Sequence, residues 1–547
     1  MALSQERSDW WRSAVLYQIY PRSFQDSDGD GVGDLQGIID RLDYLVDLGV
    51  DGLWISPFFK SPMRDYGYDV DDHRTVDPLF GSNAVFETLL AEAHARGIRI
   101  LIDLVLSHTA VSHPWFTESR QAREGEYADR YVWSDPKPDG TPPNNWLSIF
   151  GGPAWTWEPR RGQYFLHNFL STQPDLNFHH PAVRQEALDI ARYWLDRGVD
   201  GFRLDTLNFY FHDRKLRDNP PAAERDDQVV ALANPYGMQD HIHDKNQPEV
   251  EGFLDELGAL FAEYPGSIGL GEVGAGKTRA IELMKAYLEP GRMHLCYTFD
   301  LLSHQFSPAH FRAVIEREQG EGEGLWRCLS FSNHDIMRSA TRFGGDQATP
   351  ETMAPLVMAL LLSLRGTPCI YQGEELGLPE ADVPYAQLVD PYGKAFWPTF
   401  KGRDGCRTPM PWMGEHPFGG FTTGDDAPWL PITPAHLVRA VDQQTGRPGS
   451  ALEWTRELLR VRRATPALQS ETVEVLSTPD PLLGYCRGEG PGQVLCLFNL
   501  SDRTASWQAP STWTNACALV GSPDADWDPA LGALVLSPWS WVFLQHS

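Results

Sequence analysis

Ionisable side chains stand at the ends of several strand-like segments of this chain. In Gly201-Phe202-Arg203-Leu204-Asp205, the alternation of a strand puts Arg203 and Asp205 on one face and the apolar residues on the other. An arginine and a carboxylate buried at a strand end are costly unless they are paired or used in chemistry. A structural ion pair would account for this segment if it stood alone.

Three further strand-like segments deliver ionisable residues in the same way. They lead into Ser107-His108, Glu272 and Asn333-His334-Asp335. Residues at the same end of several parallel strands converge on one site. Carboxylates and imidazoles gathered there suit cleavage of a glycosidic bond, in which one carboxylic acid donates a proton while a second, ionised carboxylate attacks the anomeric carbon.

The neighbours along the sequence divide these two roles. Arg203 is two residues from Asp205, and an opposite charge within about 4–6 Å favours the ionised form of a carboxyl group. Glu272 has only apolar neighbours within the segment 270–273, so we expect it to keep its proton at neutral pH. Asp205 is the predicted nucleophile and Glu272 the predicted general acid/base.

The elements that must hold these residues alternate between strand and helix eight times. The first helix is indicated by apolar residues at helical spacing from Leu35 to Val46. Alternating strands and helices imply parallel strands joined by crossovers, and eight units predict an α/β fold, a (β/α)8 TIM barrel. The predicted strands are Val15–Tyr20, Gly52–Ser56, Ile98–Val105, Gly201–Asp205, Ile268–Glu272, Leu295–Phe299, Arg327–Ser332 and Thr367–Tyr371.

Long loops and a change of character at the end divide the chain. We predict a barrel domain over 1–105 and 179–468, interrupted after the third strand by an inserted loop-rich domain over 106–178. A second loop-rich subdomain is predicted within the barrel over 373–450. Loops this long are usually functional, and those that follow barrel strands build the active-site face. Short apolar runs broken by Gly, Pro and Asp predict a C-terminal antiparallel β-domain over 469–547.

Several motifs resemble the α-amylase superfamily (glycoside hydrolase family 13), and within it the oligo-1,6-glucosidase/α-glucosidase branch. The resemblance covers essentially the whole chain. Four signature regions are similar to those of the family in order, a fifth marks the branch and a sixth follows the eighth strand. They are Asp103–His108, Gly201–Asp205, Gly271–Val273 and Ser332–Asp335, then Gln173–Asn177, and then Gly366–Pro368 with Tyr371–Glu375.

The resemblance implies roles for individual residues. Asp205 would be the nucleophile, Glu272 the acid/base, and Asp335 the residue that binds sugar hydroxyls and stabilises the transition state. An arginine would pair with Asp65; we favour Arg403, and Arg407 stays open. A pocket closed behind one glucose implies release of single units from the non-reducing end. The implied substrate-binding residues are Asp65, Tyr68, His108, Arg203, His334, Arg403 and Arg407.

Two positions refine the predicted substrate. Ser107 stands where calcium-dependent amylases carry an asparagine ligand, so that calcium site is not expected. Thr206 stands where 1,6-specific enzymes of the branch usually have Val, which indicates an α-1,4 preference. The predicted enzyme is a retaining α-glucosidase that acts on small α-glucosides, namely maltose, sucrose and aryl glucosides, with glucosyl transfer as a side activity. A dedicated transglucosidase or a sucrose isomerase on the same scaffold is the alternative.

An acidic loop near the N-terminus predicts a metal site. Asp26-x-Asp28-x-Asp30-Gly31-Val32-x-Asp34 places carboxylates at alternate positions with a glycine for the turn, as EF-hand loops do, although Gly37 replaces the bidentate glutamate. We expect Asp26, Asp28, Asp30, Val32 and Asp34 to bind a structural Ca²⁺ or Mg²⁺ remote from catalysis; a solvated acidic turn is the alternative. No organic cofactor is expected.

Two other motifs suggest different chemistry. Gly271–Thr278 matches the G-x-x-x-x-G-K-[ST] phosphate loop and lies between a strand and a helix, so a P-loop NTPase is the rival from pattern alone. Against it, Glu272 would face phosphate oxygens of like charge. Asp240-His241-Ile242-His243-Asp244 resembles a metal cluster in composition, and we interpret it instead as part of the loop after the fourth strand.

Composition narrows the partners and the compartment. The net charge of −28 argues against nucleic acid and against an anionic membrane surface. No apolar run approaches the ~20 residues that span a bilayer, and no secretory signal is visible. Seven cysteines without C-x-x-C pairs predict neither a disulfide framework nor a zinc ribbon, which favours the cytoplasm. We expect a monomer or a homodimer.

Overall fold

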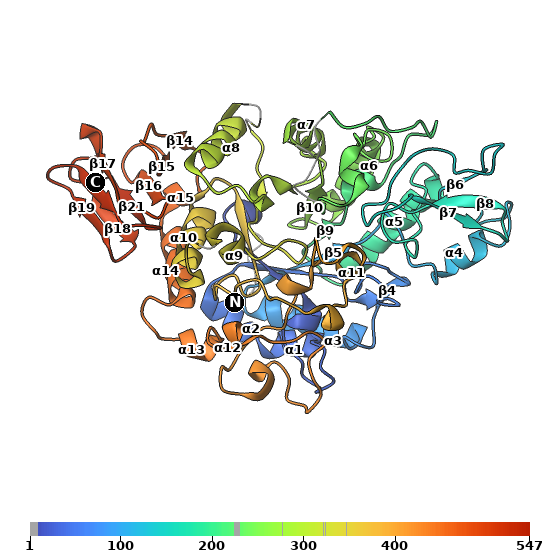
Figure 1. Cartoon of the computed structure of the whole chain (residues 1–547), viewed down its shortest axis with the longest axis horizontal. Coiled ribbons are helices and arrows are strands. Elements are labelled where there is room, and N and C mark those ends of the chain that lie inside the picture. The colour runs from blue at the N-terminus through green and yellow to red at the C-terminus, as the bar shows by residue number, and fades with distance from the viewer. Residues whose placement is uncertain are drawn as a thin grey trace.

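A parallel barrel forms the middle of the molecule in the computed structural model (Figure 1), which describes residues 9–223, 230–275, 277–320, 322, 324–345 and 347–546. Its eight strands are ordered β11-β10-β9-β5-β2-β1-β13-β12, and a parallel bridge between Cys296 and Arg327 links the two end strands. The predicted (β/α)8 barrel is confirmed. The strands are β1 Leu16–Ile19, β2 Gly52–Ile55, β5 Arg99–Leu104, β9 Gly201–Leu204, β10 Ile268–Val273, β11 Leu295–Thr298, β12 Cys328–Leu329 and β13 Thr367–Tyr371.

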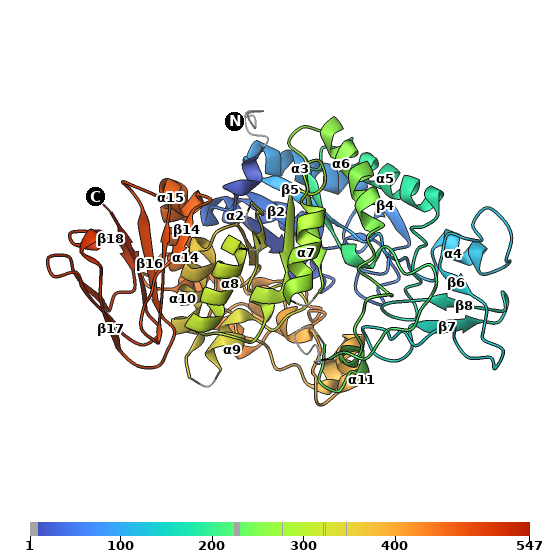
Figure 2. The same ribbon diagram turned by 90° about the horizontal axis from the view of Figure 1, so that it is seen from above.

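Helices surround the barrel (Figures 1 and 2), and α10 (Pro350–Ser363) among them is buried on all sides from Met353 to Ser363. The predicted first helix is two helices, interrupted at Arg41, whose guanidinium bonds Gln25 and stacks on Trp412. The main helices are α1 Leu35–Asp40, α2 Leu42–Leu48, α3 Asn83–Ala95, α5 Pro181–Leu195, α6 Val250–Glu263, α7 Lys277–Tyr287, α8 Pro308–Gly320, α9 Ser339–Gly344, α10 Pro350–Ser363 and α14 Ala451–Ala464.

The barrel interior changes from apolar to charged along β10. Leu270 packs with Leu101 and Leu295 in a buried cluster, whereas Glu272, two residues further along β10 and on the same face, contacts Arg203. Close strand pairing is needed here: a Cβ on Gly201 would lie 2.3 Å from the carbonyl oxygen of Ile268. The apolar end packs the barrel, and the other end carries the site.

Two antiparallel regions flank the barrel at opposite ends of the long axis (Figures 1 and 2). The segment after β5 contains α4 Pro114–Ser119 and a small sheet of β6 Trp133–Ser134, β8 Gln163–Leu166 and β7 Trp155–Glu158. The predicted C-terminal antiparallel region is present. Its two sheets contain β14 Val473–Val475, β15 Leu482–Arg487, β16 Val494–Asn499, β21 Trp541–Gln545 and β18 Cys517–Gly521, and β17 Ala505–Gln508, β20 Ala533–Leu536 and β19 Ala525–Asp528.

Between β13 and α14 the chain forms loops and short helices. These helices include α11 Pro391–Phe396, α12 Pro434–Leu437 and α13 Val441–Gln444. Across the residues that the structure describes, none of the helices has both the length and the apolar character needed to cross a bilayer.

Candidate active site

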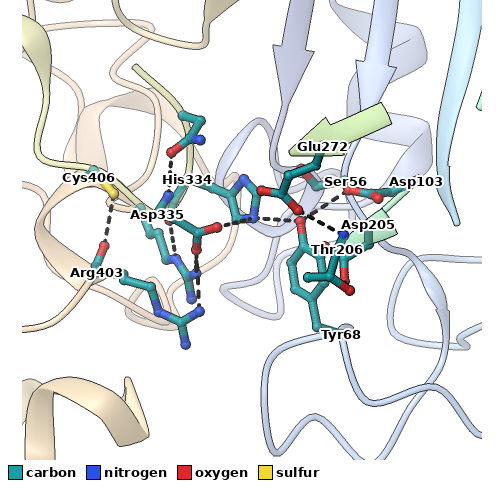
Figure 3. A network of polar contacts seen from close by, with 12 residues as sticks. Ser56, Tyr68, Asp103, Asp205, Thr206, Glu272, His334, Asp335, Arg403 and Cys406 are labelled. Atoms are coloured by element: carbon teal, nitrogen blue, oxygen red, sulfur yellow. Dashed lines mark hydrogen bonds and ion pairs between the residues drawn. The ribbon is translucent and has the colours of Figure 1, made fainter. Parts of the chain in front are cut away.

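One arginine connects the two predicted catalytic carboxylates. Arg203 on β9 is fully buried; its Nη1 lies 2.7 Å from Asp205 Oδ1 and 2.8 Å from Asp103 Oδ1, and its Nη2 lies 2.7 Å from Glu272 Oε2. The strand register explains the cluster, because Asp103 on β5 and Leu270 on β10 are the two register partners of Arg203. Asp205 and Glu272 each follow two residues later on the same faces. Figure 3 shows both carboxylates at the mouth of the barrel.

The apolar surroundings predicted for Glu272 are present only along its own strand. Its neighbours along β10 are apolar, but neighbours across the strands are not, and Arg203 contacts it from β9. Glu272 Oε2 also accepts the backbone N–H of Thr206 at 2.9 Å, and Oε1 accepts the hydroxyl of Tyr297 at 2.9 Å. Sequence neighbours alone therefore describe the environment of this carboxyl group incompletely.

Burial works against ionisation in this cluster. It raises the pKa of Asp205 well above its usual value, although Arg203 acts in the opposite direction. It also raises the pKa of Asp103 to about 6, again against the effect of Arg203. Three carboxylates share one guanidinium, so a single positive charge cannot offset the loss of water around all of them.

The residue after Asp205, the predicted nucleophile, is held in an unusual conformation. Thr206 has a φ of 45°, in the left-handed region that costs a β-branched residue about 1–3 kcal/mol. This conformation turns its N–H toward Glu272 and its hydroxyl toward Ser107 Oγ, 2.8 Å away. The end of β9 thus supplies Asp205 and a backbone donor for Glu272 together.

On the other side of the mouth, an imidazole links an aromatic ring to Asp335. His334 is buried and stacks on Tyr68, with ring centroids 5.1 Å apart and planes 4° apart. Its Nε2 lies 2.5 Å from the Tyr68 hydroxyl and 3.2 Å from Asp335 Oδ2 (Figure 3). Its Nδ1 lies 2.8 Å from Gln18 Nε2. Burial lowers the pKa of His334 to about 3, so the ring is neutral near pH 7.

Two arginines surround Asp335, and one of them resolves the open pairing of Asp65. Arg403 Nη2 lies 2.8 Å from Asp65 Oδ1, so the favoured arginine makes this pair. Arg407 Nη2 instead lies 2.8 Å from Asp335 Oδ1, and Arg403 Nη1 approaches the same oxygen at 3.3 Å. Arg403 also bonds Asp390, a fully buried partner that sequence reasoning missed.

The arginines outweigh burial at Asp335 and Asp390 but not at Asp65. Burial acts to raise the pKa of Asp335, but His334, Arg403 and Arg407 outweigh it and hold that pKa below its usual value. The pKa of Asp390 is lowered in the same way, mainly by Arg403 against the effect of burial. The pKa of Asp65 is raised by burial despite Arg403.

The remaining predicted residue, His108, completes the network. Its Nε2 lies 2.9 Å from the carbonyl oxygen of Tyr68 and 3.1 Å from Gln173 Nε2, and Gln173 Nε2 lies 3.1 Å from Asp65 Oδ2. All ten predicted catalytic and substrate-binding residues are thereby joined, directly or through one neighbour. Asp103 and Gln173 lie inside motifs recognised from the sequence, whereas Tyr297, Gln18 and Asp390 carried no signal that marked them.

The acidic loop brings three of its four carboxylates together. Oxygen atoms of Asp26, Asp28 and Asp34 lie within 4.8 Å of one another, which fits a hard divalent cation that prefers oxygen ligands. The carboxylate of Asp30 is not in this group; it is exposed and accepts the backbone N–H of Val32 at 2.8 Å. The expectation that Asp30 is a carboxylate ligand does not match this arrangement.

The two rival motifs are otherwise engaged. In the Asp240–Asp244 segment, His241 Nδ1 bonds Asp244 at 2.5 Å and its Nε2 contacts the carbonyl oxygen of Tyr236 at 2.9 Å. In the phosphate-loop match, the Glu272 carboxylate lies in the barrel cluster. Gly276 and the side chains of Lys277 and Thr278 lie outside the described residues.

The sequence matches known proteins over nearly its whole length. Residues 18–471 match the family described as alpha amylase, catalytic domain. The chain is 52% identical over 513 residues to a probable α-glucosidase of Rhizobium meliloti, which covers 93% of this chain and 92% of that protein. It is 37% identical over 542 residues to an oligo-1,6-glucosidase of Heyndrickxia coagulans, covering 92% of this chain and 94% of that one.

Solved structures extend the comparison to the fold. The α-glucosyl transfer enzyme XgtA superposes with a TM-score of 0.93 at 50% identity, covering 99% of this chain and 100% of that one. The trehalulose synthase of Pseudomonas mesoacidophila superposes with a TM-score of 0.88 at 32% identity, covering 98% and 99%. The chain therefore belongs to the α-amylase family of glycoside hydrolases, in the branch of the α-glucosidases and oligo-1,6-glucosidases.

Proposed function

We propose that this enzyme is a retaining α-glucosidase that removes terminal α-glucosyl units from small α-glucosides, with α-1,4 links preferred. The observation that carries the proposal is the contact of one guanidinium, that of Arg203, with both Asp205 and Glu272. In retaining glycosidases the two carboxyl groups are about 5–5.5 Å apart, whereas inverting enzymes separate them by about 6.5–9.5 Å to admit water. Two carboxylates held on one guanidinium favour the shorter arrangement.

In the first step, Asp205 attacks the anomeric carbon. A bond forms between a carboxylate oxygen and that carbon, the bond to the glycosidic oxygen breaks, and Glu272 gives its proton to the departing oxygen. Arg203 favours the ionised form of Asp205, because burial alone would keep it protonated. Asp335, held ionised by Arg403 and Arg407, accepts hydrogen bonds from sugar hydroxyls.

In the second step, Glu272 accepts a proton from water while the water oxygen attacks the anomeric carbon and Asp205 departs. A sugar or alcohol that replaces the water receives the glucosyl unit instead. Glucosyl transfer is therefore a side activity that needs no further residue. Water and acceptor compete at the same carbon.

The closed side of the pocket supports cleavage at the chain end. Asp65 and Arg403 form a buried ion pair, and Gln173 ties Asp65 to His108. We propose that this wall closes the pocket behind a single sugar unit, whose hydroxyls would contact Asp335 and the buried ion pair. The expected products are glucose and the shortened aglycone.

The α-1,4 preference rests on Thr206. Its hydroxyl bonds Ser107 and lies 3.2 Å from Asp205 Oδ2, beside the attacking atom. Exchange of this threonine for valine would remove both contacts and place two methyl groups next to the scissile bond. We expect Thr206→Val to lower activity on maltose relative to isomaltose.

The acidic loop would hold Ca²⁺ or Mg²⁺ through Asp26, Asp28 and Asp34. The metal would join this loop more firmly to the segment that packs on it. The backbone N–H of Trp429 donates to the carbonyl oxygen of Gly31 at 2.9 Å, and the backbone N–H of Asp26 donates to the carbonyl oxygen of Phe421 at 2.9 Å. The role is structural.

The test compares the products formed by wild type and Asp205→Ala from maltose, isomaltose, sucrose and an aryl α-glucoside. Wild type should release glucose, and the variant should lose at least about 10⁴-fold in rate, because the covalent route is removed. Asp47→Ala, which removes an exposed carboxylate on α2, is the control and should leave the rate unchanged. Equal rates for wild type and Asp205→Ala would overturn the assignment.

A second candidate has a specific observation in its favour. The solved structures that superpose on this chain include an α-glucosyl transfer enzyme and a trehalulose synthase. The same experiment separates the candidates, since a transferase or sucrose isomerase forms new glucosides in place of free glucose. If new disaccharides account for most of the consumed substrate, the enzyme is a transferase or isomerase.

A further inference from the structure

We propose that Tyr297 positions the acid proton of Glu272 and strengthens Glu272 as a proton donor. This inference rests on the proposed function and assigns a residue that no catalytic motif of the chain contains. Tyr297 lies on β11 as the register partner of Glu272 on β10. Register partners on neighbouring parallel strands point to the same side of a sheet, which brings the two side chains together.

The contacts of Tyr297 are close and buried. Its side chain is 2% exposed, its hydroxyl lies 2.9 Å from Glu272 Oε1, and Arg203 Nη2 donates to the same hydroxyl oxygen at 2.8 Å. Since Arg203 occupies a lone pair of that oxygen, the hydroxyl hydrogen is directed to Glu272. Burial raises the pKa of Tyr297 well above its usual value, so the phenol stays protonated.

The two oxygens of Glu272 differ in what they can hold. Oε2 accepts from Arg203 Nη2 and from the backbone N–H of Thr206. Both groups only donate, so a proton on Oε2 would displace one of them. The acid proton therefore belongs on Oε1.

Tyr297 then decides where that proton points. A protonated carboxyl oxygen can still accept one hydrogen bond, and the Tyr297 hydroxyl supplies it from the barrel side. The hydrogen on Oε1 is left to point away from Tyr297, toward the glycosidic oxygen. When the proton moves to the departing oxygen, Glu272 becomes a carboxylate and the bond from Tyr297 becomes charge-assisted and stronger.

Other ionisable groups face this pair from the neighbouring elements. They are Arg203 and Asp205 from the end of β9, Asp103 from β5, and Tyr210, which follows β9. None of these side chains changes identity in Tyr297→Phe, which removes one oxygen atom and keeps the ring that packs beside Trp54. A change in the pH profile of this variant would therefore trace to the lost hydroxyl.

The experiment measures kcat/KM of Tyr297→Phe for two substrates. Maltose needs protonation of its leaving oxygen, whereas a nitrophenyl α-glucoside has a leaving group stable enough to depart without it. We expect kcat/KM for maltose to fall about 10-fold or more, because a hydrogen bond to a charged group is lost. For the nitrophenyl glucoside we expect a fall of less than about threefold, because its leaving group needs no proton. The basic limb of the profile should move to higher pH, since Glu272 holds its proton more tightly without this donor.

Tyr287→Phe is the matched control. Tyr287 on α7 is equally buried, and within the described part of the chain its hydroxyl makes no hydrogen bond. Loss of this hydroxyl should change neither kcat/KM for the two substrates nor the position of the basic limb. A thermal unfolding midpoint for each variant shows whether the fold is intact.

The outcomes are separable from those of the proposed function. If wild type releases no glucose from either substrate, the proposed function fails irrespective of Tyr297. If wild type is active and Tyr297→Phe loses the same factor on both substrates with an unchanged basic limb, Tyr297 is only structural and the inference is overturned. A loss confined to maltose together with a shifted limb supports it.

Discussion

The two sides of the candidate active site surround their carboxylates with different numbers of cations. On the β9 side, Asp103, Asp205 and Glu272 share the single guanidinium of Arg203. On the other side, Asp335 alone receives bonds from two arginines and contacts an imidazole. The Asp335 side chain is also 32% exposed, against 7% for Asp205 and 0% for Asp103, so nearby cations and solvent both favour its charge.

The difference appears in the ionisation of these groups. Burial raises the pKa of Asp205, and Arg203 offsets only part of this effect. At Asp335 burial acts in the same direction, but the surrounding His334, Arg403 and Arg407 more than cancel it. Protons can move where cations are scarce, which suits acid/base chemistry, whereas a fixed charge suits binding of sugar hydroxyls.

The largest expected effect comes from removing an arginine on the Asp335 side of the site, the cation-rich side; the side around Arg203 is the cation-poor side. Arg403→Met leaves Asp65 and Asp390 as buried carboxylates without their main partner. Removal of one member of a buried ion pair typically costs about 3–5 kcal/mol. We expect a loss of this size in the free energy of unfolding, measured by denaturant titration, and a fall in kcat/KM for maltose.

Two further variants sharpen this prediction. Arg403→Lys keeps the charge but loses the planar fork that reaches Asp65 and Asp390 together, so its loss should be intermediate. Arg460→Met breaks an exposed pair with Glu457 and should change the free energy of unfolding by less than about 0.5 kcal/mol. If Arg403→Met is no less stable than Arg460→Met, the buried network does not hold this wall.

A smaller effect is expected on the cation-poor side, in the pH profile. Asp205 must be ionised to attack, so activity is lost as the pH falls through its raised pKa. The acid limb of kcat/KM should therefore lie above the pKa near 4 of an exposed aspartate. Asp103 contributes to that rise by charge repulsion. Asp103→Asn should therefore move the acid limb to lower pH. A limb that stays fixed or moves upward would mean that Asp103 does not control Asp205.

The sequence anticipated the barrel better than the details of the site. Alternating apolar strands and amphipathic helices identify the eight units, because each must bury one face. Period-two alternation also placed Arg203 and Asp205 on one face of β9. It could not place Arg203 against Glu272 or Tyr297, because those contacts depend on the register between strands that are far apart in sequence.

Long loops also limited what could be predicted from the sequence. Asp390 lies in the long segment before α14, where no periodicity fixes the direction of a side chain, and it still forms a buried pair with Arg403. The seventh barrel strand, β12, ends at Leu329, whereas the predicted strand ends at Ser332. Only Cys328 and Leu329 pair with β13. The motif residues were found because their spacing along the chain is itself the signal.

The smallest expected effect concerns the acidic loop, which supports the cation-rich side from a distance. Trp429 joins this loop to Tyr20, and Tyr20 stacks on His334 with ring centroids 5.8 Å apart. Added Ca²⁺ should raise the unfolding midpoint of wild type by a few degrees and leave the acid limb unchanged.

Two aspartate-to-asparagine variants test which carboxylates bind the metal ion. Asp28→Asn should lose the Ca²⁺-dependent rise in the midpoint, and Asp30→Asn should retain it, because only Asp28 belongs to the cluster of three. The reverse result would place the ligand set elsewhere in the loop. No rise in wild type with either Ca²⁺ or Mg²⁺ would indicate a solvated acidic turn.

The central claim is that Asp205 and Glu272, held on one arginine, act as a retaining pair. NMR of the anomeric protons in the first moments of maltose hydrolysis tests it most directly, before the released glucose equilibrates between its anomers. The arrangement around Arg203 predicts that the new glucose appears as the α anomer. Initial release of the β anomer would contradict the claim, because it would require water to attack directly from the opposite face.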